Sequence, residues 1–243
     1  LCEGLDPAVP GRLISGIGNV DSVSPSHAIW ALSRVVRGSS DLSAAFDEGV
    51  EGLRERLIGL AEGAAVLDAL DVIRHDHGAR GPGEWDMASP SWETRPELVL
   101  SLVDRLRLAD DELSPENRQA RAAADRAVAE AEVRAHLVGD DEALATLDLA
   151  IRLADLYVVG REKTKLTEMM TVHEIRVVID ALGRRMVGRG VVDAPEQVCM
   201  LLDSELEGFI QDPDASAELI RSRYERFIAL GMRQEPFILY REP

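Results

Sequence analysis

The sequence predicts an all-α fold, a multi-helix bundle with one long ordered loop rich in glycine and proline and an extended C-terminal linker. Apolar residues recur at spacings of three and four along most of the chain, as on the buried face of a helix. The alternation of apolar and polar residues that marks a strand does not persist over more than a few residues before the C-terminus. A composition of 46% hydrophobic and 29% charged residues over 243 positions suits one large globular domain or two small ones.

The first elements are predicted to be a helix and a helical pair. Residues 27–36 follow Ser24-Pro25-Ser26, a cap that places proline in the opening turn. Residues 42–60 and 61–74 are rich in Ala, Leu, Glu and Arg, which favour helices. Two antiparallel helices or one long kinked helix would bury their apolar stripes, which consist of Leu53, Leu57, Leu60, Val66, Leu70 and Ile73.

The helical pattern stops at residues 75–96, where six glycines and prolines would break a helix. The two tryptophans in this segment, Trp85 and Trp92, favour order. We therefore predict an ordered loop over about residues 75–96. Loops of this length in compact domains are usually functional or disordered.

Helical periodicity returns at residues 97–108. Ser114-Pro115-Glu116 then opens a long helix that ends near residue 137. This helix is mostly Ala, Arg and Glu, and pairs four residues apart, such as Glu130 with Arg134, belong on a solvated face.

The second half of the chain is also predicted to be helical. Gly139-Asp140-Asp141 caps a helix that runs from residue 142 towards 160, and the pattern resumes through residue 189. The helical region thus extends over residues 1–233. The remaining elements are short helices at 195–202 and 204–210, a clear helix at 215–230 and an extended segment at 234–243.

Charge and cysteine content exclude several classes of protein. The 44 acidic and 27 basic residues give a net charge of −17, which repels phosphate backbones and anionic headgroups, so neither a nucleic acid nor a membrane is an expected partner. Two cysteines, Cys2 and Cys199, cannot form a disulfide framework, and a cytoplasmic location is expected. The chain starts at Leu1 with no signal sequence, which predicts a piece of a longer protein.

Several common catalytic motifs are missing from the sequence. There is no phosphate-binding GxxxxGK[ST] loop, and Gly16-Ile-Gly18 lacks the third glycine of a dinucleotide site. His173-Glu174 begins like a zinc-protease HExxH motif, but Val177 stands where the second ligand would be. The predicted loop region contains four possible metal ligands, His75, His77, Glu84 and Asp86. No metal is predicted, since histidines and acids in a loop more often form hydrogen-bonded scaffolding than a metal site.

Charged residues fall on the packing face of the long helix predicted after Gly160. At 100° per residue, Arg161, Lys165 and Glu168 lie on or next to an apolar stripe. Arg176 lies at the edge of that stripe. Residues 161–189 contain seven basic and four acidic residues, a local net charge of +3 (7 − 4), which suits an anion such as a phosphoryl group. The stripe consists of Val172, Ile175, Ile179, Leu182 and Met186.

Lysine is rare in this chain. Lys163 and Lys165 are the two lysines among the 27 basic residues. Either a lysine that remains among so many arginines is there for its compact, flexible ammonium, or the two have clustered by chance.

The predicted loop carries Arg80, Glu84 and Asp86 between glycines that let the backbone approach another group closely. Two interpretations remain open. The loop and the charged helix face wall a pocket, or the loop is a rigid Ω-type loop whose charges are satisfied internally. In the second case the basic residues of the helix pair with nearby carboxylates, namely Arg161, Lys165 and Arg176 with Glu84, Asp86 and Glu168.

Three segments resemble a known family. They are RGPGEWDMASPSW (80–92), REKTKL (161–166) and LGRRMVGRGVVDAPEQVCMLLDSEL (182–206). They are similar to the middle, substrate-binding domain of rifampin phosphotransferase and related phosphoenolpyruvate-synthase-like phosphotransferases. Residues 13–32 and 237–243 fit the two borders of that domain, so the resemblance spans nearly the whole chain.

The resemblance implies one part of a three-part enzyme. Such enzymes have an ATP-grasp domain, a helical acceptor domain and a swivelling domain with a phosphorylated histidine, and they split ATP to AMP and phosphate. This chain would be the acceptor-substrate-binding domain, with residues 234–243 as a linker towards the swivelling domain. It would bind no cofactor and would not be active alone, because ATP and Mg²⁺ are expected in the ATP-grasp domain.

The resemblance also implies roles for residues. Arg161 and Lys165 would be catalytic, neutralising charge on the phosphoryl group as it reaches a hydroxyl of the acceptor, an apolar antibiotic or natural product. Ala79 departs from the family, in which a histidine precedes the arginine of the loop; its role would be lost or moved to His77 or His75. The residues expected to bind the substrate are Arg80, Glu84, Asp86, His77, Glu168 and Arg176.

Two alternatives remain. A non-catalytic helical module that binds a ligand or a partner would allow Arg161 and Lys165 to be sealed in salt bridges, whereas the enzyme needs them within reach of solvent. A stand-alone subunit that docks with separate ATP-grasp and phosphohistidine subunits would find its charge of −17 complemented by basic partner surfaces.

Overall fold

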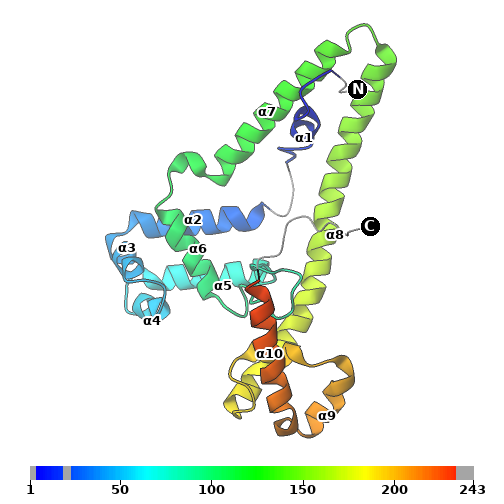
Figure 1. Ribbon diagram of the computed structural model, residues 1–243. Coiled ribbons are helices and arrows are strands. Elements are labelled where there is room, and N and C mark those ends of the chain that lie inside the picture. The colour runs from blue at the N-terminus through cyan, green and yellow to red at the C-terminus, as the bar shows by residue number, and fades with distance from the viewer. Residues whose placement is uncertain (1–3, 19–22, 234–243) are drawn as a thin grey trace. The chain divides into compact units, whose positions relative to one another are not determined.

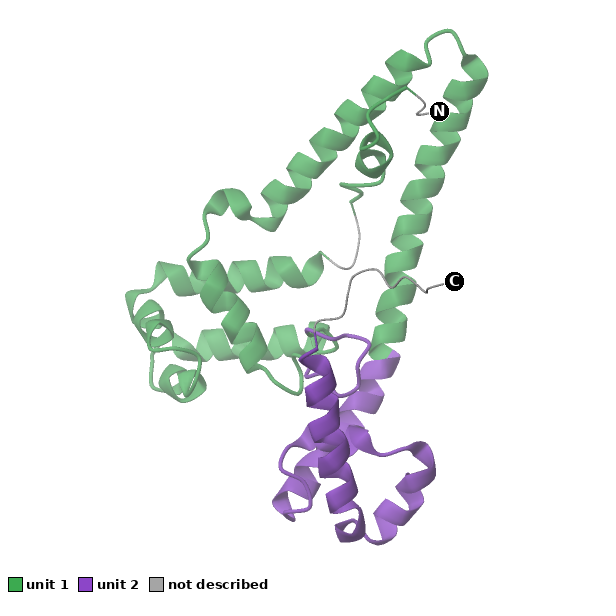
Figure 2. Cartoon of the chain, viewed as in Figure 1, with its two compact units in different colours: residues 1–81, 91–170 green, residues 82–90, 171–243 purple. Residues whose placement is uncertain are grey.

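The computed structural model describes residues 4–18 and 23–233, and within these ranges the chain forms helices and no β-strand. The predicted all-α fold class is therefore confirmed (Figure 1). The chain divides into two compact units, of which unit 1 holds residues 1–81 and 91–170 and unit 2 holds residues 82–90 and 171–243 (Figure 2). The predicted linker, residues 234–243, lies outside the described residues.

Five helices of unit 1 enclose its largest core. They are α2 (Ser24–Gly38), α3 (Ser40–Asp47), α4 (Leu53–Ile58), α5 (Gly63–His77) and α6 (Glu97–Arg107). Proline occupies the first turn of α2, as predicted, and α2 packs against α3, α5 and α6. The side chains that these helices bury completely include Val36, Leu42, Leu57, Leu70 and Val103.

The helices predicted over residues 42–60 and 61–74 differ from the structure in number and length. Three helices form in place of two, because Gly49 and Gly52 adopt φ angles of 95° and 67° and break the helix between α3 and α4. The helical spacing of apolar residues continues across this break, so the sequence pattern does not show it. Helix α5 continues to His77, so the loop begins at Gly78 and not at residue 75.

The other helices of unit 1 form an antiparallel pair, α7 (Pro115–His136) and the first part of α8 (Asp141–Gly188), with the short η1 (Asp111–Leu113) before α7. Two ion pairs of 2.6 Å join α7 to α8, Arg126 with Asp155 and Arg134 with Asp148. The predicted pair of Glu130 with Arg134 is confirmed at 2.7 Å. The polar face of α7 therefore binds α8 as well as solvent.

A short helix that the sequence analysis did not predict, α1 (Val9–Leu13), lies on α7. Arg12 forms ion pairs with Asp125 (2.9 Å) and Glu132 (3.0 Å). The side-chain amide of Gln119 donates to the carbonyl oxygen of Gly16 (3.0 Å). A five-residue helix shows no periodicity in sequence, and contacts with residues more than 100 positions away hold this one in place.

Gly16 and Gly18 allow a matched test of this contact. Gly16 has a φ of 64°, and a Cβ atom there would lie 2.5 Å from the backbone of Ala122, whereas a Cβ at Gly18 would meet open space. We expect Gly16→Ala to lower the free energy of unfolding by about 1 to 3 kcal/mol through overpacking and backbone strain. Urea unfolding followed by circular dichroism measures this, and an equal loss in Gly18→Ala would contradict it.

Unit 2 consists of the end of α8 and a series of shorter helices. Its core includes Met186, Val192, Phe209 and Ile220. Gly183 lets α8 approach the next segment closely, because a Cβ there would lie 2.2 Å from the carbonyl oxygen of Pro195. The short helices predicted after residue 195 are present, as η2 (Pro195–Met200), η3 (Asp203–Glu205), α9 (Leu206–Gln211), η4 (Asp214–Ser216) and α10 (Ala217–Gly231).

Glu205 and Arg223 join η3 to α10 and make unit 2 sensitive to acid. Their two hydrogen bonds measure 2.5 and 2.8 Å, and the amide of Leu202 donates a third at 2.8 Å. These bonds, that of Arg223 first, lower the pKa of Glu205 from 4.5 to about 2. Because the folded pKa lies below the unfolded one, the stabilisation is complete above pH 4.5 and is lost as the pH falls towards 2.

Glu205→Gln is therefore expected to lower the melting temperature at neutral pH and to reduce its fall between pH 5 and 2, because less stabilisation remains to be lost by protonation. Thermal unfolding at a series of pH values measures this. Glu207→Gln, at an exposed position two residues away, is the control. An unchanged acid dependence in Glu205→Gln would show that the pair with Arg223 contributes nothing.

Candidate functional site

The loop between α5 and α6 is closed at its base by hydrogen bonds within unit 1. The amide of Trp92 donates to the carbonyl oxygen of Arg80 (2.8 Å), and the amide of Glu93 donates to that of Gly78 (3.2 Å). Ser91 is fully buried, and its amide donates to the hydroxyl oxygen of Thr94 (3.0 Å). The loop is thus ordered by its own contacts, as predicted and as in an Ω-loop. Its tip, residues 82–90, belongs to unit 2.

Unit 1 brings together four of the predicted site residues. His77 ends α5, and Arg80 follows at the base of the loop. The Nη1 atom of Arg80 lies 3.9 Å from the Sδ atom of Met169, which is fully buried on α8. Lys165 and Arg161 occupy the two preceding turns on the same side of α8, since residues four apart share a helix face. Arg80 therefore lies at the end of a row formed by Arg161, Lys165 and Met169.

The cations of this row differ in exposure. The side chain of Arg161 is 73% exposed and pairs with Glu162 at 2.6 Å, and not with Glu168. Lys165 is half-buried and makes polar contacts of its own, and Glu168 is exposed. Arg161 therefore meets the requirement that a catalytic cation be within reach of solvent.

His77 is half-buried beside this row. Burial lowers the pKa of its imidazole, and the charge of Arg80 lowers it further, against the opposing effect of Asp76. The imidazole is therefore neutral at pH 7 and can accept a proton. Ala79, where the family resemblance expects a histidine, is only 9% exposed, so its side chain offers no group to a ligand.

In unit 2, Arg176 holds the tip of the loop through the backbone. Its side chain is 2% exposed, and Nη2 donates to the carbonyl oxygens of Gly83 (3.2 Å), Glu84 (2.9 Å) and Asp86 (3.0 Å). The pairing of Arg176 with carboxylates was therefore wrong, because main-chain oxygens accept instead. Burial lowers the pKa of Arg176, and the charges of Asp86 and Glu84 oppose this. Among the described residues, its Nε and Nη1 atoms have no hydrogen-bond partner.

The loop tip also forms one wall of a cavity of about 710 Å³ within unit 2. The second wall is α8, the third consists of residues 198–201 with Asp203 and Leu206, and Phe227 of α10 completes the lining. A volume of this size accommodates a drug-sized or natural-product ligand. The apolar side chains of the lining include Trp85, Met87, Ile175, Ile179, Leu182, Met200 and Leu206.

The lining of this cavity was predictable from the sequence only in part. Ile175, Ile179 and Leu182 appeared as an apolar stripe, and Asp86 as a site residue, but the lining contributed by Cys199 and Phe227 was missed. The predicted site residues also divide between the two units, with Glu84, Asp86 and Arg176 in unit 2. Only the folded chain brings the cavity segments together, and no spacing in the sequence indicates it.

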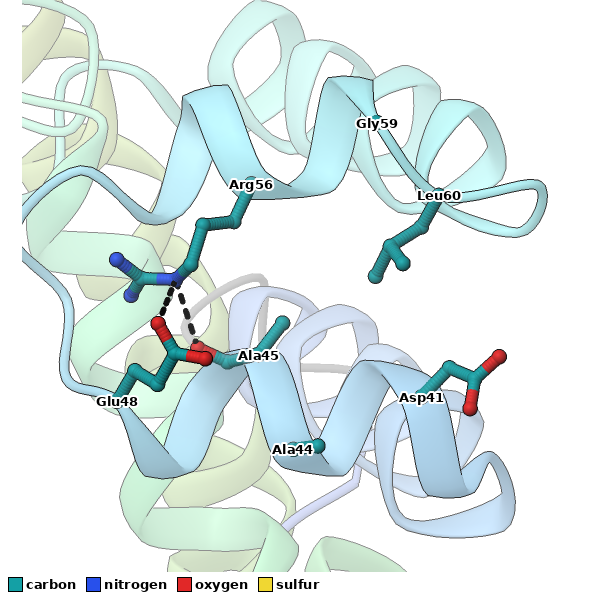
Figure 3. A pocket seen from close by; sticks show the side chains of 7 residues that line it. All are labelled: Asp41, Ala44, Ala45, Glu48, Arg56, Gly59 and Leu60. Carbon is teal, nitrogen blue, oxygen red and sulfur yellow. Dashed lines mark hydrogen bonds and ion pairs between the residues drawn. The ribbon is translucent and has the colours of Figure 1, made fainter.

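A smaller cavity, of about 370 Å³, lies between α3 and α4 in unit 1 (Figure 3). Its one basic residue is Arg56, whose Nε donates to the carbonyl oxygen of Ala45 (3.1 Å) and lies 3.6 Å from Glu48 (Figure 3). Arg56 also donates to the carbonyl oxygens of Gly49 and Glu51. The guanidinium thus caps the end of α3, which is a structural role.

Residues 4–18 and 23–233 form neither a metal-binding cluster nor a membrane-spanning helix. No group of three or more His, Cys, Asp and Glu side chains in these ranges is arranged to hold a metal ion. No helix described there has the length and apolar character needed to cross a membrane.

Comparison with known proteins adds one finding. The family model described as "Rifampicin phosphotransferase fourth domain" matches residues 4–162. No curated protein matches the chain. The matched residues include the whole of α1 to α7, the loop and the start of α8 as far as Glu162, whereas residues 171–243 of unit 2 lie beyond the match.

Proposed function

The chain belongs to the family of rifampicin phosphotransferase fourth domains, and from that membership we propose that it is the acceptor-substrate-binding domain of an ATP-dependent, phosphohistidine-relayed phosphotransferase. The observation that carries the proposal is the row of Arg161 and Lys165 on α8, with Arg80 at its end. Arg161 lies inside the matched residues, and Lys165 lies one turn after it. A cationic row in a chain of net charge −17 favours a phosphoryl group locally.

In this proposal the cations stabilise the transferring phosphoryl group. The bond between phosphorus and the histidine nitrogen of the donor domain breaks as the acceptor oxygen bonds to phosphorus. Arg161 and Lys165 neutralise charge on the three phosphoryl oxygens. The hydroxyl proton of the acceptor passes to a base, and the candidate is His77 beside Arg80, since burial lowers the pKa of its imidazole. Over the whole cycle, ATP, water and the alcohol give AMP, phosphate and the phosphate ester.

The rest of the machinery lies outside this chain. The ATP-grasp domain, which binds ATP and Mg²⁺, and the phosphohistidine domain would be supplied by the same longer protein or by separate subunits. The apolar cavity of unit 2 would hold the body of the acceptor, with Glu84, Asp86 and Arg176 shaping its loop wall. The acceptor is then an apolar antibiotic or natural product with a free hydroxyl.

Single-turnover transfer tests this function. The phosphorylated full-length enzyme, or this chain mixed with a phosphohistidine donor domain, is incubated with a panel of apolar alcohols. Formation of a phosphate monoester, seen by ³¹P NMR together with loss of phosphohistidine, supports the proposal. Phosphohistidine that persists with every alcohol, or is lost equally when this chain is omitted, contradicts it.

A partner-binding module is the second candidate, and one observation favours it. Leu149, Leu153, Leu156 and Tyr157 form a stripe on α8 in which each side chain is at least 40% exposed. Exposed apolar stripes of this kind mark protein interfaces. A chain that binds a partner through this stripe and shows no acceptor-dependent transfer would fit the module and not the enzyme.

A further inference from the structure

The cavity of unit 2 carries information about its ligand beyond apolar character. Its lining contains two charged side chains, Asp86 and Asp203, and both are carboxylates. No lysine, arginine or histidine of the described residues contributes to the lining. Neither carboxylate forms an ion pair within the described ranges; Asp86 accepts a hydrogen bond from the amide of Ala88 (2.9 Å). Among the described residues, the charges that a bound ligand would meet at the wall are therefore negative.

One buried cation, Arg176, interacts electrostatically with Asp86. Arg176 does not line the cavity, and its Nη2 donates to three main-chain oxygens and not to the carboxylate of Asp86, which is exposed. Cys199 also lines the cavity. Burial raises the pKa of its thiol to about 11, and the negative charges of Asp86 and Glu196 raise it further.

Negative charge beside an apolar wall selects among ligands. Asp86 and Asp203 are both exposed, so a neutral ligand in the cavity leaves them hydrated and gains nothing from their charge. A ligand carboxylate would add repulsion between like charges. A protonated amine would form charge-assisted hydrogen bonds with these carboxylates. The aromatic rings of Trp85 and Phe227 in the same lining can also attract a cation.

We propose that the cavity of unit 2 binds a lipophilic ammonium compound, with its apolar body among the α8 and 198–201 side chains and its protonated amine at Asp86 and Asp203. The proposal rests on the proposed function in one respect, since it takes the ligand of this cavity to be the acceptor. The acceptor is then a hydrophobic amino alcohol, which carries the hydroxyl to be phosphorylated and an amine for recognition.

Three probes with one carbon skeleton test the charge preference. They are 4-phenylbutylamine, 4-phenylbutan-1-ol and 4-phenylbutanoate, titrated calorimetrically into the 243-residue chain at pH 7. We expect the amine to bind about tenfold more tightly than the alcohol, and the carboxylate more weakly than either, since one ammonium meets two carboxylates.

Paired amide variants locate the effect. The double variant Asp86→Asn with Asp203→Asn removes both charges, and the amide oxygen at position 86 can still accept from the amide of Ala88. Its affinity for the alcohol should equal that of the unaltered chain. Its affinity for the amine should fall to about that for the alcohol. Asp212→Asn is the control, because Asp212 also caps a backbone amide, that of Ala215 at 3.3 Å, outside the cavity lining. It should keep the preference for the amine.

The outcomes separate the ligand class from the site. If the alcohol binds as tightly as the amine and the double variant changes nothing, the ammonium preference is overturned while the cavity remains a candidate acceptor site. An equal loss of preference in Asp212→Asn overturns it too, because the effect would then be one of net charge. If none of the three probes binds, both the ammonium preference and the use of this cavity for the acceptor are overturned, whereas single-turnover transfer still tests the enzyme function separately.

Discussion

Replacement of Lys165 by alanine is expected to slow phosphoryl transfer to the acceptor by roughly 10²- to 10³-fold, the usual effect of removing one group that stabilises charge in the transition state. Lys165 is half-buried on α8, four residues before buried Met169, which Arg80 contacts. A partly buried ammonium acts in a lower effective dielectric than water, so it attracts phosphoryl oxygens more strongly than an exposed one. Single-turnover transfer from phosphohistidine in the full-length enzyme measures the effect, with helix content followed by circular dichroism.

The other lysine of the chain provides the control. Lys163 is exposed, and a separation of two residues places it about 200° from Lys165 around the helix. Lys163→Ala should therefore transfer at close to the rate of the unaltered enzyme. Full activity in Lys165→Ala, or an equal loss in Lys163→Ala, would remove Lys165 from the mechanism and leave the positive charge of the row without a specific role.

Helix content was predictable because most helices of this chain bury one apolar stripe. The starts of α2 and α7, each with proline in the first turn, follow from local signals. Helix α8 is longer than predicted, because the helix expected to run towards Gly160 continues through that residue to Gly188. The break between α3 and α4 was not predictable from periodicity, because Phe46, Val50 and Leu53 keep spacings of four and three across it. The positive φ angles of Gly49 and Gly52 produce that break, and glycine in a sequence permits such angles without requiring them.

The site was predictable in its residue types but less so in its geometry. The wheel placed Arg161 and Lys165 on one side of α8, and the structure adds Arg80 at the end of that row. The helical wheel could not show that Arg176 donates to main-chain oxygens. Every residue has a carbonyl oxygen, so the sequence does not indicate which of them accepts a hydrogen bond from a side chain. The cavity depends on three segments that are distant in sequence, and its two carboxylates gain meaning only once the apolar walls around them are known.

Arg176→Ala is expected to lower the free energy of unfolding of unit 2 by about 2 to 4 kcal/mol, because it empties a buried volume and leaves three carbonyl oxygens of the loop tip without their donor. Arg176→Lys should be intermediate, since an ammonium can reach some of these oxygens but lacks the planar fork of guanidinium. The measurements are urea unfolding and the rate at which a glutamyl endopeptidase cleaves the native chain after Glu84.

The two readouts distinguish a loop clamp from general helix stability. Arg185→Ala removes an exposed arginine from the same helix and should change neither the unfolding free energy nor the cleavage rate. If Arg176→Ala unfolds as the unaltered chain does and Glu84 stays protected, the three hydrogen bonds do not hold the loop. If cleavage accelerates, the same variant should also weaken ligand binding in the cavity, because Trp85, Asp86 and Met87 form its loop wall. Loop order and acceptor binding would then depend on one buried arginine.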